Sequence, residues 1–155
     1  MRRQDEVASP SILNFELDVA QILWCFFPED EMRKKGQRFA PPGSKARPCF
    51  IVKVYDDGAI LVVKGTSDIA QKRDWDFFVD KSNSMEFNAC GLSESTRFKV
   101  DSIQDIPFNA EYFQEFEESG TCLLGSAPDS VIERFRIAYQ AWAHEVQRLM
   151  KLRNR

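Results

Sequence analysis

The stretch RPCFIVKVYDDGAILVVKGTS, residues 47–67, determines the fold that this sequence predicts. It contains two apolar runs, residues 49–52 and 60–63, each of a length typical of a buried strand. Asp56-Asp57-Gly58 between them is a strong hairpin signal, because glycine readily adopts the positive φ that such turns need. The stretch therefore predicts two antiparallel strands joined by a tight turn.

Arg47 opens the first strand of this hairpin and Thr66 closes the second, so both lie at the same end of the ladder. Pro48 fits this arrangement, because a proline cannot donate to a sheet and is tolerated at the first position of a strand. Arginine offers a fork of fixed donors and threonine one adjustable donor, a combination that suits a phosphate. The sequence leaves open the alternative that Arg47 only caps a strand end and Thr66 only makes a turn.

Apolar runs and alternating patterns predict further strands on both sides of the hairpin. These strands are residues 22–27, 75–79, 95–100 and 121–124. A turn is expected at 82–84 and a short helix at 108–116, while glycines and prolines in 29–46 indicate a long loop.

The C-terminal residues give the clearest helical pattern, with apolar side chains along one stripe at helical spacing. Ser130 and Glu133 match a capping box at the start of this helix. We expect the stripe to pack on the rest of the domain, and a dimer contact is the alternative.

The composition is that of one globular domain: 155 residues, 43% hydrophobic and 29% charged. No apolar run approaches the length of a membrane span and no secretory signal begins the chain, so we expect a cytoplasmic protein. The four cysteines form no C-x-x-C pair, and His144 is the single histidine. A zinc cluster and a histidine-based catalytic pair are therefore excluded, and neither a metal nor a cofactor is expected.

The net charge of -3 counts against a dedicated nucleic-acid-binding protein, which is usually basic. The charges are unevenly distributed, however, because no acidic residue occurs between Glu31 and Asp56. The basic residues in the first part of that interval are Arg33, Lys34, Lys35, Arg38, Lys45 and Arg47. A local basic patch can bind phosphate whatever the total charge. The alternative is a solvated charged loop.

Taken in order, these segments resemble the MazF/PemK (CcdB-like) family of type II toxins. The matching segments lie between residues 20 and 125 and are 22–28, 43–52, 65–67 and 91–98, the last looking like a PemK-like subgroup. The resemblance implies an α+β fold, a small SH3-like antiparallel β-barrel (CcdB/PemK-like) with a long C-terminal amphipathic helix. The expected divisions are an N-terminal arm (1–18), a barrel domain (19–128) and a C-terminal helix packed on the barrel (129–155).

The resemblance also implies a metal-independent endoribonuclease that cleaves single-stranded RNA, usually as a homodimer, with a cognate antitoxin whose acidic tail covers the RNA groove. The catalytic pair of the family falls on Arg47 and Thr66, and a further functional arginine falls on Arg97. Two departures leave the general base unassigned. Residues 40–43 contain no histidine, and Lys99 stands where some members carry an acid.

Besides Arg97, the candidate substrate contacts are Lys53, Ser67, Arg38, Lys45 and Phe39. Arg38 and Phe39 are suited to grip and stack a base, although Phe39 equally suits burial in the barrel. Arg97 and Lys53 are equally compatible with an ordinary surface role. Two other functions stay open: a non-catalytic barrel that binds or inhibits a protein partner, as gyrase-poisoning relatives do, and an inactive prophage or immunity protein.

Overall fold

The computed structural model describes residues 15–29, 36–115 and 121–154, and all structural statements below concern these residues. The strands are β1 (Gln21–Cys25), β2 (Arg47–Val54), β3 (Ile60–Thr66), β4 (Asp76–Val79), β5 (Thr96–Ile106) and β6 (Leu123–Ser126); the helices are α1 (Ser84–Cys90) and α2 (Asp129–Arg153). Most of the predicted N-terminal arm (1–18) lies outside the described residues. The same holds for Arg33, Lys34 and Lys35 of the basic segment.

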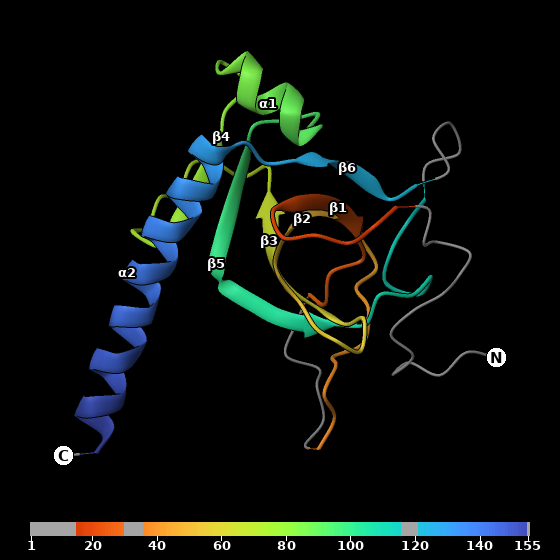
Figure 1. Cartoon of the computed structure of the whole chain (residues 1–155). Helices are drawn as coiled ribbons and strands as arrows, with labels where there is room; N and C mark the ends of the chain where they lie inside the picture. Colours follow the sequence, from red (N-terminus) through yellow and green to blue (C-terminus); the bar gives the residue numbers. More distant parts are fainter. Residues whose placement is uncertain (1–14, 30–35, 116–120, 155) are drawn as a thin grey trace.

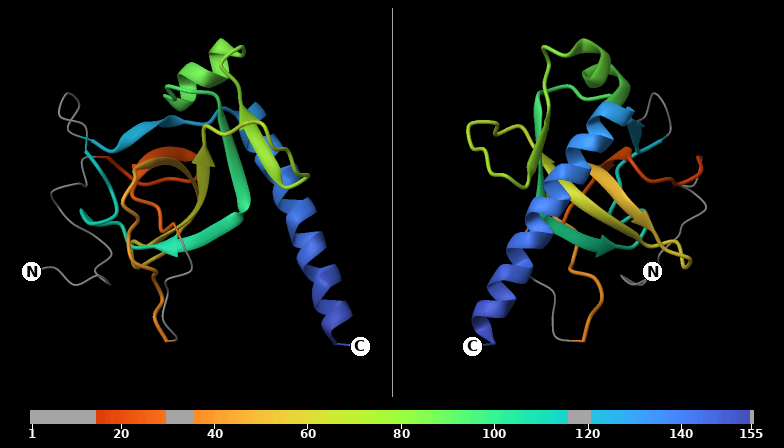
Figure 2. Two further views of the ribbon diagram at one scale, coloured as in Figure 1. Left: turned by 180° about the vertical axis from the view of Figure 1, so that it is seen from behind. Right: turned by 60° about the vertical axis from the view of Figure 1, so that its left-hand side comes forward.

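The six strands form one sheet in the order β4-β5-β3-β2-β1-β6, and every neighbouring pair is antiparallel. The sheet curls into a half-barrel, and α2 crosses its outside next to β4 and β5 (Figure 1). Figure 2 shows the same arrangement from two further sides, with the C-terminal half of α2 extending past the sheet. The predicted α+β class, a small antiparallel barrel with a long C-terminal helix, is confirmed.

Both faces of the central strands are buried, which explains why their sequences are apolar without alternation. Successive side chains of a strand point to opposite faces. Cys49 and Ile51 belong to the core inside the half-barrel, whereas Phe50 between them belongs to a second core beneath α2. Val62 and Val63 divide in the same way. A change of register by one residue would exchange the contents of the two cores.

The predicted hairpin is confirmed as β2 and β3. The backbone N–H of Tyr55 donates to the carbonyl of Ala59 at 2.9 Å, and Gly58 has the positive φ of 90° that the turn requires. Cys49 pairs with Lys64 in the ladder, and Arg47 and Thr66 are the residues at which β2 begins and β3 ends at this side of the hairpin. The sequence prediction that these two residues share one end of the hairpin is therefore correct.

The pairing of β3 with β5 contains an irregularity that the sequence did not predict. Val62 pairs with Gln104 but Lys64 pairs with Lys99, so β5 carries extra residues at this point. The hydroxyl of Ser102 accepts a hydrogen bond from the Lys64 N–H at 2.9 Å and donates to the Lys99 carbonyl at 2.6 Å. This side chain satisfies two backbone groups where the ladder is interrupted. The strand predicted at 95–100 consequently extends to Ile106.

The helix predicted at 108–116 is wrong over its described part. Residues 107–115 form a turn and irregular segment that includes one isolated bridge, Cys25 to Phe113. Phe108, Tyr112 and Phe113 enter the core of the half-barrel from this segment. These three aromatic residues are spaced in the sequence as they would be on one face of a short helix, but in the structure a turn buries them.

Two helix starts also differ from the predictions. The turn expected at 82–84 is the start of α1, because the Asn83 side chain accepts from the Glu86 N–H as an N-cap. The capping box at Ser130 is absent, because α2 begins with Pro128 at its N-cap and the Ser130 hydroxyl bonds Glu86 instead. The strand expected at 121–124 is shifted to β6, Leu123–Ser126.

Only the first half of α2 is packed against the sheet. Val131 and Ala138 are buried, and the Phe135 ring lies 4.9 Å from Phe50 between centroids. Further along the helix, Met150 is 56% exposed and Leu152 is 48% exposed. The predicted apolar stripe is thus divided into a covered part and an uncovered part. Among the described helices, none is long and apolar enough to span a membrane.

The C-terminal end of α1 tests how tightly this helix is docked on β6. Gly91 has φ 69°, and a Cβ there would overlap the Leu124 carbonyl. We expect Gly91→Ala to lower the free energy of unfolding by more than the about 1–2 kcal/mol of left-handed strain alone. Gly36→Ala is the matched control, because Gly36 has φ 88° but no atom within 4 Å of its added Cβ. Urea denaturation that gives equal losses for both variants would contradict the tight docking.

Candidate functional site

A cavity of about 490 Å³ opens where β2 begins and β3 ends. We call it the rim cavity. Four residues predicted from the sequence line it: Lys45, Arg47, Thr66 and Ser67. Trp24 from β1 and Leu92 from the segment after α1 form apolar parts of its wall. The hairpin therefore brings the predicted catalytic pair into one solvent-accessible hollow, and neither side chain is sealed beneath other atoms.

The Arg47 guanidinium is held by Glu29, a residue that the sequence analysis did not select. Arg47 Nε donates to Glu29 Oε1 at 2.9 Å, and Nη2 donates to Oε2 at 3.3 Å. The Arg47 side chain is 24% exposed. The hydrogen bond from Arg47 lowers the pKa of Glu29, and the positive charges of Lys64 and Lys45 lower it further. The carboxylate is therefore ionised at neutral pH and fixes the direction of the guanidinium.

Thr66 is fixed by a turn immediately after β3. Its Oγ1 accepts a hydrogen bond from the Asp68 N–H at 3.2 Å, and the Asp68 carboxylate accepts from the Ala70 N–H at 3.3 Å. Because a hydroxyl has one donor and two acceptor sites, Thr66 keeps its proton for donation into the cavity. Thr66 therefore does two things: it stabilises a turn, which was the alternative left open by the sequence, and it lines the rim cavity.

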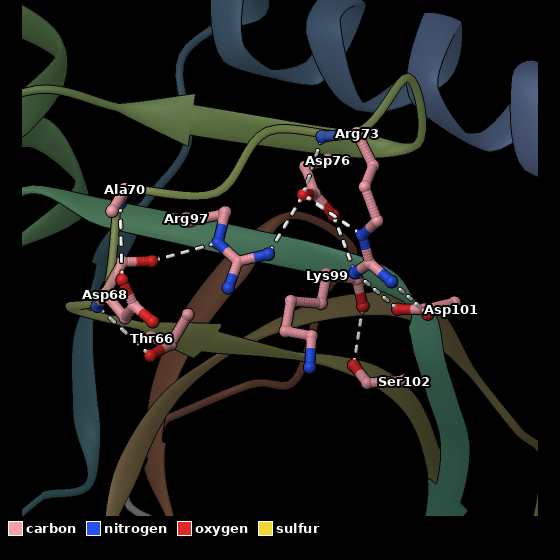
Figure 3. Close-up of polar contacts among 9 residues, drawn as sticks. All are labelled: Thr66, Asp68, Ala70, Arg73, Asp76, Arg97, Lys99, Asp101 and Ser102. Atoms are coloured by element: carbon pink, nitrogen blue, oxygen red, sulfur yellow. Dashed lines mark hydrogen bonds and ion pairs between the residues drawn. The ribbon is translucent and has the colours of Figure 1, made fainter.

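Arg97 lies beneath this turn and is buried. Its Nε donates to the Asp68 carbonyl at 2.9 Å, and Nη1 donates to Asp76 Oδ2 at 3.0 Å. Figure 3 shows the guanidinium between these two acceptors. Arg97 lines neither cavity described here, so its observed contacts are those of a residue that positions the turn after Thr66.

Asp76 connects Arg97 to a second arginine. Its carboxylate is fully buried and accepts from Arg97 and from Arg73, whose Nη2 lies 3.0 Å from Oδ1. Arg73 also pairs with the more exposed Asp101 at 2.6 Å. Asp76 therefore joins the start of β4 to β5 behind the rim cavity (Figure 3).

A larger cavity of about 910 Å³ lies along β3 and the bend of β5. We call it the lysine groove, because Lys64 and Lys99 line it at paired positions of the two strands. Glu29 lines this groove while its partner Arg47 lines the rim cavity. The ion pair between them therefore marks the point where the two hollows adjoin.

The other predicted contacts are placed outside the rim cavity. Arg38 lines the lysine groove and pairs with Asp57. Phe39 is buried with the Arg38 guanidinium 4.8 Å from its ring centroid, which is the packing alternative that the sequence left open. Lys53 is exposed, lies 4.9 Å from the Tyr55 ring centroid and lines neither hollow.

Sequence reasoning missed Glu29, Asp76 and Lys64. Glu29 follows the first strand closely, but its approach to Arg47 depends on the pairing of Cys25 with Arg47, for which the sequence carries no local signal. The proximity of Lys64 to Lys99 depends on the irregular register of β5, for which the sequence carries no local signal. Within the described part of the chain, no group of three His, Cys, Asp or Glu side chains is arranged to hold a metal ion.

No protein-family profile matches the sequence, and a comparison with curated protein sequences finds no match. A comparison of structures finds a chain described as an endoribonuclease in complex with its cognate antitoxin from mycobacterial species. The two chains are 13% identical, and the match covers 79% of this chain and 90% of the other with a TM-score of 0.47. Similarity at this level carries no functional argument, so the site is interpreted from its own geometry.

The buried carboxylate behind the site gives a stability prediction. Asp76→Ala would leave Arg97 buried without a counter-charge, and we expect it to lower the free energy of unfolding by about 3–5 kcal/mol. Asp101→Ala removes a partly exposed partner of Arg73 and should cost only about 0–1 kcal/mol. Urea denaturation of both variants measures the difference. Equal losses would show that the Asp76 pair does not hold β4 to β5.

Proposed function

We propose that this protein is a metal-independent endoribonuclease that cleaves single-stranded RNA, with an active site formed by Arg47 and Thr66 in the rim cavity and by Glu29 in the adjoining lysine groove. The observation that carries the proposal is the meeting of Arg47 and Thr66 in one accessible hollow, with a carboxylate bonded to the arginine. These three groups supply a cationic fork, a hydroxyl donor and a base, which are the functions that cleavage by the ribose 2′-hydroxyl requires.

In this mechanism Arg47 binds the scissile phosphate and stabilises the charge that develops on its oxygens. Glu29 occupies Nε and one N–H of Nη2, so the opposite edge of the guanidinium remains to donate to a phosphate. Donors held in place before the reaction stabilise the transition state without reorganisation. The ion pair with Glu29 supplies this preorganisation.

Glu29 is the group that we assign as general base. It is ionised and bonded to the guanidinium that would hold the phosphate, which places it beside the reacting centre. Glu29 takes the proton of the 2′-hydroxyl as the 2′-oxygen attacks phosphorus. The bond to the 5′-oxygen then breaks, and Glu29 returns the proton to that oxygen through water. The products are a 2′,3′-cyclic phosphate and a 5′-hydroxyl.

Thr66 orients the same phosphate through its hydroxyl, and its position is fixed by the Asp68 turn above Arg97. Lys45 and Ser67 line the same cavity and are assigned to neighbouring parts of the RNA backbone. Arg97 is assigned a positioning role, because its guanidinium bonds Asp68 and Asp76.

The principal test is cleavage of a single-stranded RNA in the presence of EDTA. We expect the unmodified protein to cleave and Arg47→Ala to lose about 100–1000-fold in kcat, since one charge-stabilising donor typically contributes this much. Arg136→Ala, an exposed arginine of α2 that lines neither cavity, is the matched control. Intact RNA with the unmodified protein, or equal cleavage by Arg47→Ala, would refute the proposal.

Substitutions of Glu29 separate its two roles. Glu29→Gln keeps an oxygen acceptor for Arg47 but cannot take a proton, so we expect a loss of about 100-fold or more in kcat, close to that of Glu29→Ala. The base acts when deprotonated, and its pKa is lowered by Arg47. Activity should therefore fall on acidification only below the ordinary carboxyl range. Near-normal kcat for Glu29→Gln would leave Glu29 as a positioning residue only.

A second candidate function is a non-catalytic module that binds a protein partner. The observation that favours it is the uncovered apolar part of α2, where Leu149, Met150 and Leu152 are exposed. For this protein we also propose a homodimer contact. We propose in addition a cognate antitoxin, whose acidic segment would compete with RNA for the rim cavity. Stoichiometric capture of a protein without RNase activity, lost when Leu149, Met150 and Leu152 are replaced by serine, would favour this second function.

A further inference from the structure

The lysine groove next to the proposed active site is lined by as many carboxylates as cations, but two of its cations have no ion-pair partner among the described residues. Lys64 and Lys99 are directly paired across β3 and β5, and both side chains line the groove. In the described part of the chain, no carboxylate lies within ion-pair distance of either ammonium. The Lys64 ammonium lies over an aromatic face, 5.8 Å from the centroid of Phe27.

The carboxylates that line the same groove are already engaged with other groups. Glu29 is bonded by Arg47, and Asp101 is bonded by Arg73. Asp105 accepts a hydrogen bond from the Tyr55 hydroxyl at 2.7 Å. The carboxylates that line the groove with Lys64 and Lys99 are therefore bonded to other donors. The groove itself is large enough for a ligand.

The positions of the two lysines relative to Arg47 and Thr66 follow from the strand geometry. Lys64 is two residues before Thr66 on β3, so the two side chains leave the same face of the sheet about 6.5–7 Å apart. Arg47 and Cys49 on β2 have the same relation, with Cys49 opposite Lys64. The lysines therefore form the next row behind the proposed catalytic row, at a distance comparable to the step between successive phosphates of an extended strand.

We infer that Lys64 and Lys99 form a second phosphate subsite, which binds a backbone phosphate of single-stranded nucleic acid adjacent to the one held by Arg47. This inference rests on the proposed function, because it extends the same bound strand into the lysine groove.

The electrostatics of Lys64 agree with such a site. Burial lowers the pKa of Lys64, and the positive charges of Lys99 and Arg47 lower it further. An arriving phosphate would relieve both the repulsion and the loss of solvation. The Ser102 hydroxyl fixes the backbone of both lysines, so the two ammonium groups are presented from a rigid part of the sheet.

The test measures binding with a strand that cannot be cleaved. The probe is a fluorescent single-stranded RNA of eight nucleotides, fully 2′-O-methylated, and its anisotropy is titrated at several KCl concentrations. We expect the double variant K64M/K99M to bind about tenfold more weakly at low salt, with the slope of log K against log salt reduced by about 0.7 for the lost phosphate contact. K64R/K99R should restore both values.

Methionine keeps the apolar stem of each lysine and removes only the charge, so the double variant should fold. Lys81→Met is the matched control, because Lys81 is exposed and lines neither cavity. With cleavable RNA, K64M/K99M should raise KM and leave kcat at saturation unchanged, unlike Arg47→Ala.

Equal affinity and equal salt slope for K64M/K99M and the unmodified protein would overturn the subsite. So would the absence of binding by the unmodified protein, or equally tight lysine-dependent binding of a polyglutamate peptide, which would assign the groove to carboxylates. Lysine-dependent binding without any cleavage of ordinary RNA would support the subsite and refute only the proposed reaction. Normal cleavage with unaffected lysine variants would refute only the subsite.

Discussion

The register of β2 and β5 against β3 is the constraint on which the rest of the structure depends. It is imposed by burial on both faces, because a shift of one residue would move every apolar side chain of these strands into the opposite core. The same pairings bring Arg47 and Thr66 to one end of the hairpin, where both line the rim cavity, and place Lys64 opposite Lys99. Core packing and site geometry are therefore determined by one set of strand pairings.

A series of polar contacts fixes the position of Thr66 in the wall of the rim cavity. The Arg97 guanidinium donates to the Asp76 carboxylate and to the Asp68 carbonyl. The Asp68 N–H in turn donates to the Thr66 hydroxyl. A buried carboxylate and a buried guanidinium both lose solvation, and the attraction between Asp76 and Arg97 offsets part of that loss. The contacts of Arg97 thus act on the site through the backbone.

The parts of the fold that could be predicted are those determined by short segments. The hairpin 47–67 has its strands, turn and end residues within one stretch, so the meeting of Arg47 with Thr66 followed from the sequence. The described part of segment 108–116 was wrongly assigned to a helix, because Phe108, Tyr112 and Phe113 are spaced for a helix face but enter the core from a turn. Pairings that depend on the irregularity in β5, including that of Lys64 with Lys99, lie beyond any local pattern.

Glu29 was missed because its partner Arg47 is separated from it by a long loop, and only the pairing of β1 with β2 brings them together. α1 was missed because seven residues carry too little periodicity, although Asn83 and Gly91 mark both of its ends. The chemical suitability of a single residue was thus easier to predict from the sequence than the identity of its neighbours in the folded chain.

The bond between Glu29 and Arg47 has a consequence for discrimination among anions. Glu29 already balances the charge of the guanidinium, so an isolated inorganic phosphate or a free nucleotide that bonds the remaining edge of Arg47 gains little net Coulomb attraction. An anion gains more only by engaging several cations at once. A protein built in this way would stay unoccupied among the abundant small phosphates of a cell and would respond to polymers.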